Sequence, residues 1–375
     1  MKHAVYNWQL NREMRYKYPE SRPEKQVAWV FDTNKCIACQ TCTIACKNAW
    51  TAGKGQESMW WNNVETKPWG FYPLGWDVRL LEMLGRQKWD GGRYVGLTIF
   101  EKVAPGEEHL GWLPDEEDYQ YPNIGEDEVN QTVKQGEYIR IPHQPWMFYL
   151  ARICNHCTYP ACLSACPRNA IYKRDDGIVL IDQKRCRGYQ ECIRACPYKK
   201  TFFRKLTGKS EKCIGCYPAV EQGRQTQCVN TCIGKIRISG YLSQENEPRA
   251  DNPIDYLVHI LKIALPLYPQ FGTGPNVYYI PPIHVPDEFN RQLFGPGAKR
   301  STELYTKAYD DEKLVGLLML FVSTDRIIHS FKVKKALCYG YDDQGREVVK
   351  VPLKEPIVVR KAYDRQSDVH RISVS

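Results

Sequence analysis

The fold is decided by residues 153–200, which read ICNHCTYPACLSACPRNAIYKRDDGIVLIDQKRCRGYQECIRACPYKK. Two cysteine groups lie in this stretch, namely Cys154-x2-Cys157-x4-Cys162-x3-Cys166 and Cys186-x5-Cys192-x3-Cys196, and a proline follows each of them. The connector predicts a strand over Ala170–Lys173, a turn over Asp175–Gly177 and a strand over Ile178–Asp182, because β-prone residues flank an Asp-Asp-Gly sequence. The stretch therefore predicts two cysteine-rich turns joined by a hairpin.

Two further cysteine groups flank this stretch. They are Cys36-x2-Cys39-x2-Cys42-x3-Cys46 and Cys213-x2-Cys216-x11-Cys228-x3-Cys232. Three thiolates two residues apart on a curled loop reach three irons of one cluster, and a fourth, three residues further on, ligates the neighbouring cluster. The spacing therefore predicts four iron–sulfur clusters in cross-linked pairs. Structural zinc stays open as an alternative, above all for the fourth group, which consists of two separated cysteine pairs.

The prolines suggest which groups pair. The segment from Cys154 to Pro197 resembles a bacterial two-cluster ferredoxin, whereas the first and fourth groups have Lys47 and Ile233 in place of the proline. We therefore expect an inner pair formed by the second and third groups, nested within an outer pair formed by the first and fourth. Sequential pairing, first with second and third with fourth, stays open, because only the cross-ligation rule limits it.

The nested arrangement assigns ligands to all four clusters. The expected sets are Cys36, Cys39, Cys42 and Cys232 for one [4Fe–4S] cluster, Cys46, Cys213, Cys216 and Cys228 for a second, Cys154, Cys157, Cys162 and Cys196 for a third, and Cys166, Cys186 and Cys192 for a [3Fe–4S] cluster. The last set lacks a fourth thiolate because Tyr189 stands where ferredoxin spacing places a cysteine. A neutral phenol with a pKa of about 10 is a poor substitute for a thiolate. A four-iron cluster with a water, hydroxide or tyrosinate ligand at this corner stays open.

We expect structural roles, and not cluster ligation, for His156 and Cys338. His156 lies inside CNHC, where the cysteines already suffice as ligands, so we expect it to form a hydrogen bond. Cys338 is the only cysteine outside the four groups, and we expect a buried free thiol.

The composition is that of a globular protein. The chain has 375 residues, of which 43% are hydrophobic and 25% are charged. Its mean hydropathy is −0.53, and its longest apolar run, Leu314–Val322, is far shorter than the roughly 18 residues of a membrane span. We therefore expect that run to be a buried helix. The first thirty residues contain no apolar signal region and no twin arginine, which argues against a disulfide-rich secreted scaffold.

The positive charge is concentrated near the cysteines. The net charge is +9, and residues 146–240 contain 17 Lys and Arg against 6 Asp and Glu. An oxidised cluster with its thiolates carries a charge of about −2, so four clusters nearly cancel this local excess. The expected counter-charges are Lys35, Arg152, Arg168, Lys184, Arg185, Arg187, Lys199, Lys200 and Lys212. A zinc-containing, basic nucleic-acid-binding protein is the alternative from a different class.

The four groups, their order and the aromatic residue in place of one cysteine resemble the beta subunit of respiratory nitrate reductase and its relatives. These relatives include nitrite oxidoreductase and the enzymes of perchlorate, selenate, dimethyl sulfide and ethylbenzene. The resemblance extends to YNWQL (6–10), CIACQTCTIACKNAW (36–50), MWWNNVETKPWGFYP (59–73), ICNHCTYPACLSACPRNAIYKR (153–174) and GIVLIDQKRCRGYQECIRACPYKK (177–200). The segments 6–10 and 59–73 look most like nitrite oxidoreductase.

This resemblance implies an electron-transfer subunit without catalytic residues of its own. It implies a catalytic alpha subunit with a molybdenum–bis(pterin guanine dinucleotide) cofactor facing the cluster of Cys36, and a haem-b gamma subunit facing the three-iron cluster. Nitrite oxidation or nitrate reduction is the expected reaction of the complex, and perchlorate, selenate, dimethyl sulfide or a hydrocarbon are the alternative substrates. We expect a periplasmic or equivalent location by co-export with a twin-arginine partner, and the cytoplasmic face of a membrane as the alternative.

The expected fold class is α+β, with two nested bacterial-ferredoxin-like two-cluster domains, a large insertion and a C-terminal extension. The expected units are an N-terminal arm (1–30), an outer ferredoxin-like pair (31–50 plus 200–240), an insertion (51–145), an inner pair (146–199) and a C-terminal cap (241–375) that contacts a partner. In the cap, Ile254–Leu265 and Asp311–Ser323 predict helices, and Asp342–Gly345 predicts a hairpin turn. The acidic stretch from Glu107 to Glu128 predicts either a cover over the clusters or a solvated loop.

Overall fold

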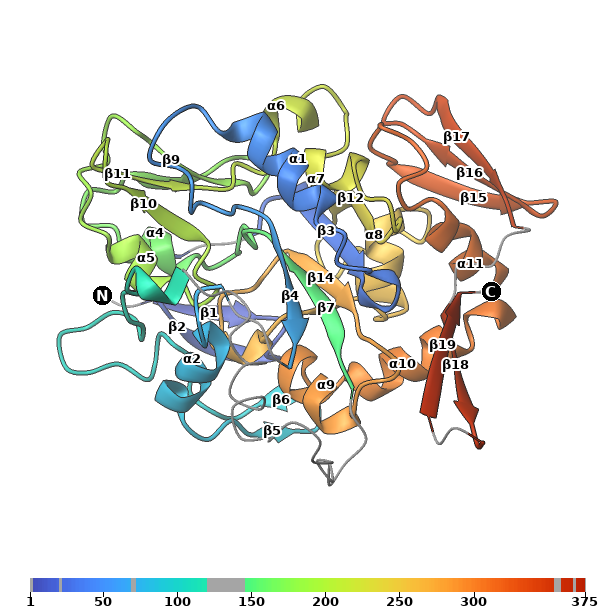
Figure 1. The fold of residues 1–375 in the computed structure, drawn as a ribbon, viewed down its shortest axis with the longest axis horizontal. Coiled ribbons are helices and arrows are strands. Elements are labelled where there is room, and N and C mark those ends of the chain that lie inside the picture. The colour runs from blue at the N-terminus through green and yellow to red at the C-terminus, as the bar shows by residue number, and fades with distance from the viewer. Residues whose placement is uncertain are drawn as a thin grey trace, which may run out of the picture.

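Strand β3 (Gln26–Asp32) runs through the centre of the molecule and is buried along its whole length. In the computed structural model, β3 pairs antiparallel with β12 (Arg237–Leu242) and parallel with β14 (Val277–Ile280), and β14 pairs with β13 (Leu265–Pro266) (Figure 1). Its run of apolar residues is typical of a strand that is covered on both faces. The structure describes residues 3–19, 22–68, 72–119, 146–353, 359–366 and 369–374.

The hairpin predicted between the second and third cysteine groups is confirmed. Strand β8 (Ile171–Lys173) pairs antiparallel with β9 (Val179–Ile181), so each strand is slightly shorter than the sequence predicted. Gly177 in the turn has a φ of +77°, a left-handed conformation that glycine adopts without strain. A second hairpin, β10 (Thr201–Arg204) with β11 (Lys209–Lys212), follows the third cysteine group.

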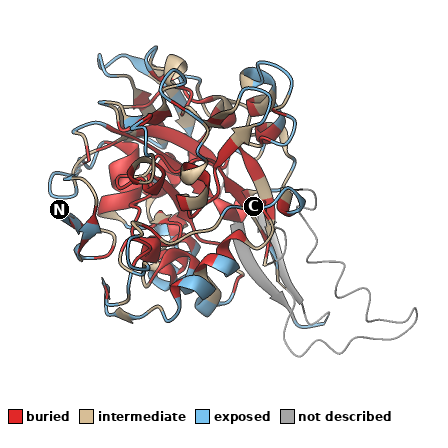
Figure 2. Cartoon of the chain, turned by 90° about the vertical axis from the view of Figure 1, so that its left-hand side faces the viewer, coloured by how far each residue is buried: buried red, intermediate tan, exposed pale blue. Residues whose placement is uncertain are grey.

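Two pairs of short helices contain several of the cysteines. Helix α4 (Ala161–Ser164) packs against α5 (Glu191–Ala195), and α1 (Thr41–Trp50) packs against α7 (Gln227–Asn230). The first pair joins the second and third cysteine groups, and the second pair joins the first and fourth. Figure 2 shows that the centre of the molecule, where the strands and short helices meet, is largely buried. Mixed helix and sheet content is therefore confirmed.

The segment between the first and second cysteine groups joins the sheet through strand β4 (Asn63–Lys67), which pairs antiparallel with β7 (Phe148–Arg152). Buried ion pairs hold it there. Arg152 is paired with Glu65, and its guanidinium donates to the carbonyl oxygen of Tyr198 at 2.8 Å. Breaking a buried ion pair by removing one partner costs about 3–5 kcal/mol, so this contact fixes the insertion against the loop that follows Cys196.

The described part of the acidic stretch covers the ferredoxin-like region. Glu107 pairs with Arg194 at 2.6 Å, Glu108 pairs with Lys17 at 2.8 Å, and Glu116 pairs with Lys205. These contacts support the first of the two expectations for residues 107–119, a cover. Residues 120–128, the rest of the stretch, lie outside the described residues.

The N-terminal segment, which the sequence predicts as an extended arm, is a hairpin packed on the body of the molecule. Strand β1 (His3–Asn7) pairs with β2 (Arg12–Tyr16), and Leu10, Met14 and Tyr16 are buried. The alternating apolar residues of β2 account for this packing, because successive side chains of a strand point to opposite faces.

Both helices predicted in the C-terminal region are present. The first, α8 (Pro253–Asp255) with its continuation Tyr256–Ile260, ends earlier than predicted, near Lys262, which has a φ of +55°. The second, α11 (Glu312–Met319), includes most of the longest apolar run and is buried from Leu314 onward. The hairpin turn at 342–345 is confirmed, and it joins β16 (Leu337–Tyr341) to β17 (Glu347–Pro352). Strand β15 (Ser330–Lys334) forms a sheet with β16 and β17.

The other described strands are β5 (Trp89–Asp90), β6 (Arg93–Tyr94), β18 (Val359–Asp364) and β19 (Val369–Val374). The other described helices are α2 (Trp76–Leu84), α6 (Tyr217–Val220), α9 (Asp287–Phe294) and α10 (Ala298–Thr306).

In the described ranges, no helix combines the length and the apolar character needed to cross a membrane.

Replacement of His259 by glutamine should make stability less sensitive to pH. Burial, and after it the positive charge of Arg22, lowers the pKa of His259 to about 4. The unfolded chain binds this proton below a pH of about 6.5, so the native state loses stability as the pH falls from 6.5 toward 4. Between pH 7.0 and pH 5.5 we expect the free energy of unfolding of the native chain to fall by about 1 kcal/mol more than that of the variant. The apparent melting temperature, measured at both pH values, should show this difference. An equal fall in the two proteins would contradict this assignment.

Candidate iron–sulfur centres

Three cysteines of the first group and one cysteine that is distant in sequence lie together. Cys36, Cys39 and Cys42, together with Cys232, line one small cavity. Burial raises the pKa of the Cys36 thiol to about 11, and the neighbouring Cys42 and Cys232 thiols raise it in the same direction. The guanidinium of Arg237 donates to the Sγ atom of Cys42 at 3.0 Å. A buried cation in this position would compensate the negative charge of four thiolates that held a cluster.

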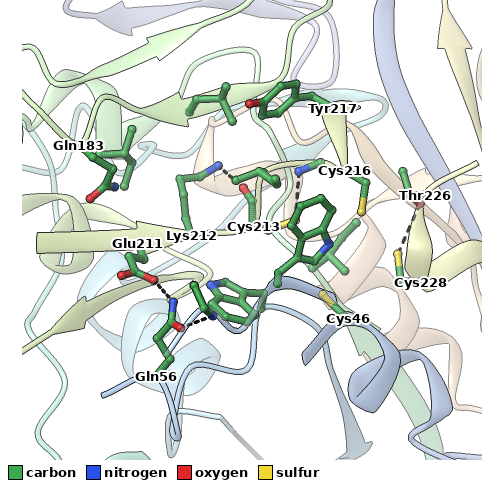
Figure 3. Close-up of a pocket in the computed structure, with 18 of the residues that line it drawn as sticks. Cys46, Gln56, Gln183, Glu211, Lys212, Cys213, Cys216, Tyr217, Thr226 and Cys228 are labelled. Atoms are coloured by element: carbon green, nitrogen blue, oxygen red, sulfur yellow. Dashed lines mark hydrogen bonds between the residues drawn. The ribbon is translucent and has the colours of Figure 1, made fainter. Parts of the chain in front are cut away.

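The second set lines a cavity of about 560 Å³. Figure 3 shows Cys46, Cys213, Cys216 and Cys228 around it, from α1, the loop after β11 and α7. Burial raises the pKa of Cys46, and the thiols of Cys213, Cys228 and Cys216 raise it further. The backbone N–H of Gly215 donates to the Sγ atom of Cys213 at 3.4 Å, which stabilises a thiolate there.

The third set consists of Cys154, Cys157, Cys162 and Cys196, which line a small cavity beside α4 and α5. The backbone N–H of Lys200 donates to the Sγ atom of Cys196 at 3.5 Å. Burial raises the pKa of Cys162, and Cys196 is the neighbouring thiol that raises it most.

The hydrogen-bonding role predicted for His156 is confirmed. Its ring is fully buried, and Nδ1 accepts a hydrogen bond from the backbone N–H of Val179 at 3.1 Å. This bond ties the loop of the second cysteine group to strand β9.

The remaining three cysteines also interact with one another. Burial raises the pKa of Cys192 to about 12, and the thiols of Cys166 and Cys186 raise it in the same direction. Backbone N–H groups of Ala170 and Ser210 donate to Cys166 and Cys186 at 3.3 and 3.4 Å, respectively.

The four loops share a backbone conformation that spacing alone does not reveal. The residue two positions after the first cysteine of each group has a positive φ: Ala38 (53°), His156 (41°), Gly188 (69°) and Gly215 (62°). In the first and third groups, the residue four positions after that cysteine is also left-handed, at Gln40 (58°) and Gln190 (61°). The loop around Tyr189 therefore has the same turns as the loop around Cys39, and both residues are exposed. Tyr189 therefore occupies in its loop the backbone position that Cys39 occupies in the first group.

Electrostatic interactions between the sets indicate their order in space. After burial, the thiol of Cys154 also raises the pKa of Cys213, so the second and third sets are neighbours. In the same way, the thiol of Cys196 adds to the effect of burial on the pKa of Cys192, so the third and fourth sets are neighbours. Arg237 lies among thiols of the first and second sets, including Cys228. Burial alone lowers the pKa of Arg237, but these thiols outweigh it and raise the pKa.

The residues predicted as counter-charges divide into two classes. Lys35, Arg152, Lys199, Lys200 and Lys212 are buried, whereas Arg168, Lys184, Arg185 and Arg187 are exposed. Burial lowers the pKa of Lys212, but the thiols of Cys154, Cys213 and Cys162 outweigh burial and raise it. Burial instead lowers the pKa of Lys35, Lys199 and Lys200, so Lys212 is the buried lysine of this class whose charge the neighbouring thiols favour.

Arg237 is a candidate functional residue that the sequence pattern does not single out. It lies far from the cysteines of the first group along the chain and follows the last cysteine of the fourth group by five residues. No sequence pattern separates it from the other basic residues of this region. Its pairing in β12 with β3 brings it beside Phe31 and Cys42.

Replacement of Arg237 by methionine should lower the reduction potentials of the centres in the first and second sets. A positive charge favours the reduced, more negative form of a cluster, so its loss favours the oxidised form. We expect electron transfer through the complex to slow about tenfold. Redox titration followed by electron paramagnetic resonance checks this, with Arg237→Lys as the charge-conserving control. Unchanged potentials in Arg237→Met would exclude the role.

Metal-ligand geometry adds one observation. In the part of the chain that the structure describes, no three His, Cys, Asp or Glu side chains converge closely enough to hold a single metal ion. The thiolates of an iron–sulfur cluster bind different irons and need no such convergence. Grouped thiols, backbone donors and buried cations fit a cluster chemically.

Comparisons with known proteins agree with this chemistry. The family described as "4Fe-4S dicluster domain" matches residues 145–242. The chain is 44% identical over 307 residues to the chlorate reductase subunit beta of Ideonella dechloratans, covering 74% of this chain and 89% of that protein. It is 43% identical over 306 residues to the selenate reductase subunit beta of Thauera selenatis, with coverages of 74% and 89%. It is also 43% identical over 297 residues to the respiratory nitrate reductase subunit beta of Haloferax mediterranei, with coverages of 70% and 76%.

Proposed function

The chain belongs to the family of electron-transferring beta subunits of molybdenum oxidoreductases, and on this premise we propose that it relays electrons through three [4Fe–4S] clusters and one [3Fe–4S] cluster. The proposed ligands are the four sets of cysteines given above. The proposed architecture is nested, with 146–199 as the inner pair and 31–50 plus 200–240 as the outer pair. When bound, the clusters supply one-electron chemistry, and the chain holds them, shields them from water and balances their charge.

One observation carries the nested assignment. Cysteines that are far apart in sequence line the same cavity in the sets that nesting requires: Cys232 lies with the first group, and Cys46 lies with the fourth. The packing of α1 on α7 and of α4 on α5 supports the same pairing. Sequential pairing, which joins the first group to the second, has no comparable support among the described cavities.

The three-iron assignment rests on Tyr189. In its loop the backbone has the turns found around Cys39, and the ring is exposed. A phenol at this position supplies no thiolate for a fourth iron.

The proposed partners are a catalytic subunit with a molybdenum–bis(pterin guanine dinucleotide) cofactor, next to the first set, and a haem-b subunit, next to the fourth. The relatives named above are beta subunits of chlorate, selenate and nitrate reductases, so subunits of this family occur in enzymes with different substrates. We propose nitrite oxidation or nitrate reduction for this complex, on the resemblance of residues 6–10 and 59–73. A periplasmic or equivalent location stays part of the proposal. The nucleic-acid-binding alternative finds no support in the comparisons.

Elemental analysis of the natively purified complex tests the proposal. This chain should contribute about 15 iron atoms, and the complex should contain stoichiometric molybdenum and no zinc. Full iron without molybdenum would retain the clusters and exclude the partner. Zinc in place of iron would overturn the proposal. About 16 iron atoms from this chain would show that the fourth cluster contains four irons and not three.

A further inference from the structure

A buried hydroxyl group lies next to one of the proposed cluster ligands. The Oγ1 atom of Thr226 lies 3.5 Å from the Sγ atom of Cys228, and Figure 3 shows both residues at the cavity that the second set lines. Both residues are buried. A hydrogen bond between this hydroxyl and a thiolate sulfur would therefore be shielded from water, where it is stronger than in solvent.

The Thr226 side chain does not have the usual role of a threonine at its position. Thr226 is the N-cap residue of α7, and a threonine there usually accepts a hydrogen bond from a backbone N–H of the first turn. The Thr226 side chain forms no such bond. Its oxygen instead accepts a hydrogen bond at 3.2 Å from the indole Nε1–H of Trp29, which lies 197 residues away in sequence.

The indole determines the direction of these two hydrogen bonds. An indole N–H can only donate, so the Oγ1 atom of Thr226 is the acceptor in its contact with Trp29. A hydroxyl group has one proton, and a thiolate has none to donate. When Cys228 is a thiolate, the proton of Thr226 is therefore the one that lies between the oxygen and the sulfur. Successive hydrogen bonds of this kind polarise and strengthen one another.

Trp29 is well placed to orient the hydroxyl. It lies in the middle of the central strand β3, where it is opposite Ser239 of β12 and Val277 of β14, and it is fully buried. Its backbone N–H donates to the carbonyl oxygen of Asn276 at 3.0 Å, and its ring lies 5.4 Å from that of His156, measured between centroids. A side chain on a paired central strand is positioned more precisely than one on a loop.

We propose that Trp29 is a positioning residue, which keeps the hydroxyl of Thr226 directed at Cys228 and thereby raises the reduction potential of the second cluster. This inference rests on the proposed function, because it takes the second set of cysteines as the ligands of a cluster. Hydrogen bonds to the sulfur ligands are among the factors that set the potential of an iron–sulfur cluster. An added electron makes the cluster and its thiolates more negative, so a donor stabilises the reduced form more than the oxidised form.

A double-mutant cycle in the native complex tests this inference. The complex is purified with the wild-type chain, with Thr226→Val, with Trp29→Phe and with both changes. Valine removes the hydroxyl and keeps the branched shape, and phenylalanine removes the N–H and keeps an aromatic ring. Redox titration followed by electron paramagnetic resonance gives the potentials, and the signal that is lost in Cys216→Ala identifies the second cluster. Iron analysis accompanies each preparation.

We expect both single changes to lower the potential of the second cluster. Thr226→Val should shift the equilibrium between its oxidised and reduced forms by about tenfold, which is about 59 mV for one electron. Trp29→Phe should shift it in the same direction by about threefold or more. The double variant should show no larger shift than Thr226→Val, because the two residues act through one hydroxyl. Thr226→Ser is the matched control, which keeps the hydroxyl and should retain the wild-type potential.

Three results obtained at full iron content would overturn the inference and leave the proposed function intact. They are an unchanged potential in Thr226→Val, shifts of the single variants that add in the double variant, and a shift in Thr226→Ser as large as in Thr226→Val. Trp29→Leu, which also removes the N–H, takes the place of Trp29→Phe if the latter does not assemble with full iron. A wild-type complex with iron far below about 15 atoms from this chain would instead refute the proposed function.

Discussion

Replacement of Cys216 by alanine is expected to slow electron transfer through the complex by about two orders of magnitude or more. Cys216 lines the 560 Å³ cavity together with Cys46, Cys213 and Cys228. This set lies in the interior of the row, next to Arg237 on one side and to Cys154 on the other. If electrons pass along the proposed row, a defect in the second set interrupts the path between the first set and the fourth.

The chain offers a matched control for this variant. Cys338 is also buried, and burial raises its pKa to about 12, but it lies outside the four groups in the core beneath the C-terminal sheet. Cys338→Ala should keep the iron content and the rate of the wild type. The measurement is electron transfer from a viologen dye through the complex, with iron analysis of each preparation. A normal electron-transfer rate in Cys216→Ala, or an equal loss of rate in Cys338→Ala, would refute electron transfer along the proposed row of cysteine sets.

Replacement of Tyr189 by cysteine is expected to convert the proposed three-iron cluster into a four-iron cluster. The backbone already has the turns of a ligand loop, with Gly188 and Gln190 in the left-handed conformation as Ala38 and Gln40 are around Cys39. The new thiol therefore needs no rearrangement of the backbone to reach the position that Cys39 has in the first group. We expect the iron contribution of this chain to rise from about 15 to about 16 atoms. The electron paramagnetic resonance signal of the oxidised three-iron cluster should disappear completely.

Tyr189→Phe is the control, because it keeps the ring and adds no ligand. It should retain the three-iron signal at full intensity. A four-iron cluster in the wild type, or an unchanged signal in Tyr189→Cys, would show that the phenol is not what keeps the fourth iron away. The two variants separate ligand chemistry from the packing of the ring.

Local sequence accounts for much of this molecule. Cysteine spacing is a local property, and so is the Asp-Asp-Gly turn at 175–177, which forms the predicted hairpin. The role of His156 followed from the same kind of reasoning, because the neighbouring thiols left it no place as a ligand. The helix predicted to end at Leu265 ends near Lys262 because the backbone there turns left-handed, which propensity does not reveal.

The sequence by itself determined the four cysteine groups and the hairpin between the inner two, and it places Tyr189 where ferredoxin spacing predicts a cysteine. Only the tertiary structure decided which basic residues are buried among the thiols and which face solvent, because burial depends on strand pairings such as β3 with β12. Arg237 is the clearest case, since that pairing alone brings it to Cys42. Arg168 and Lys200 have the same charge and similar distances from a cysteine in sequence, yet one is exposed and the other is buried. Ligand spacing is encoded over a few residues, whereas the dielectric surroundings of a charge are set by parts of the chain hundreds of residues apart.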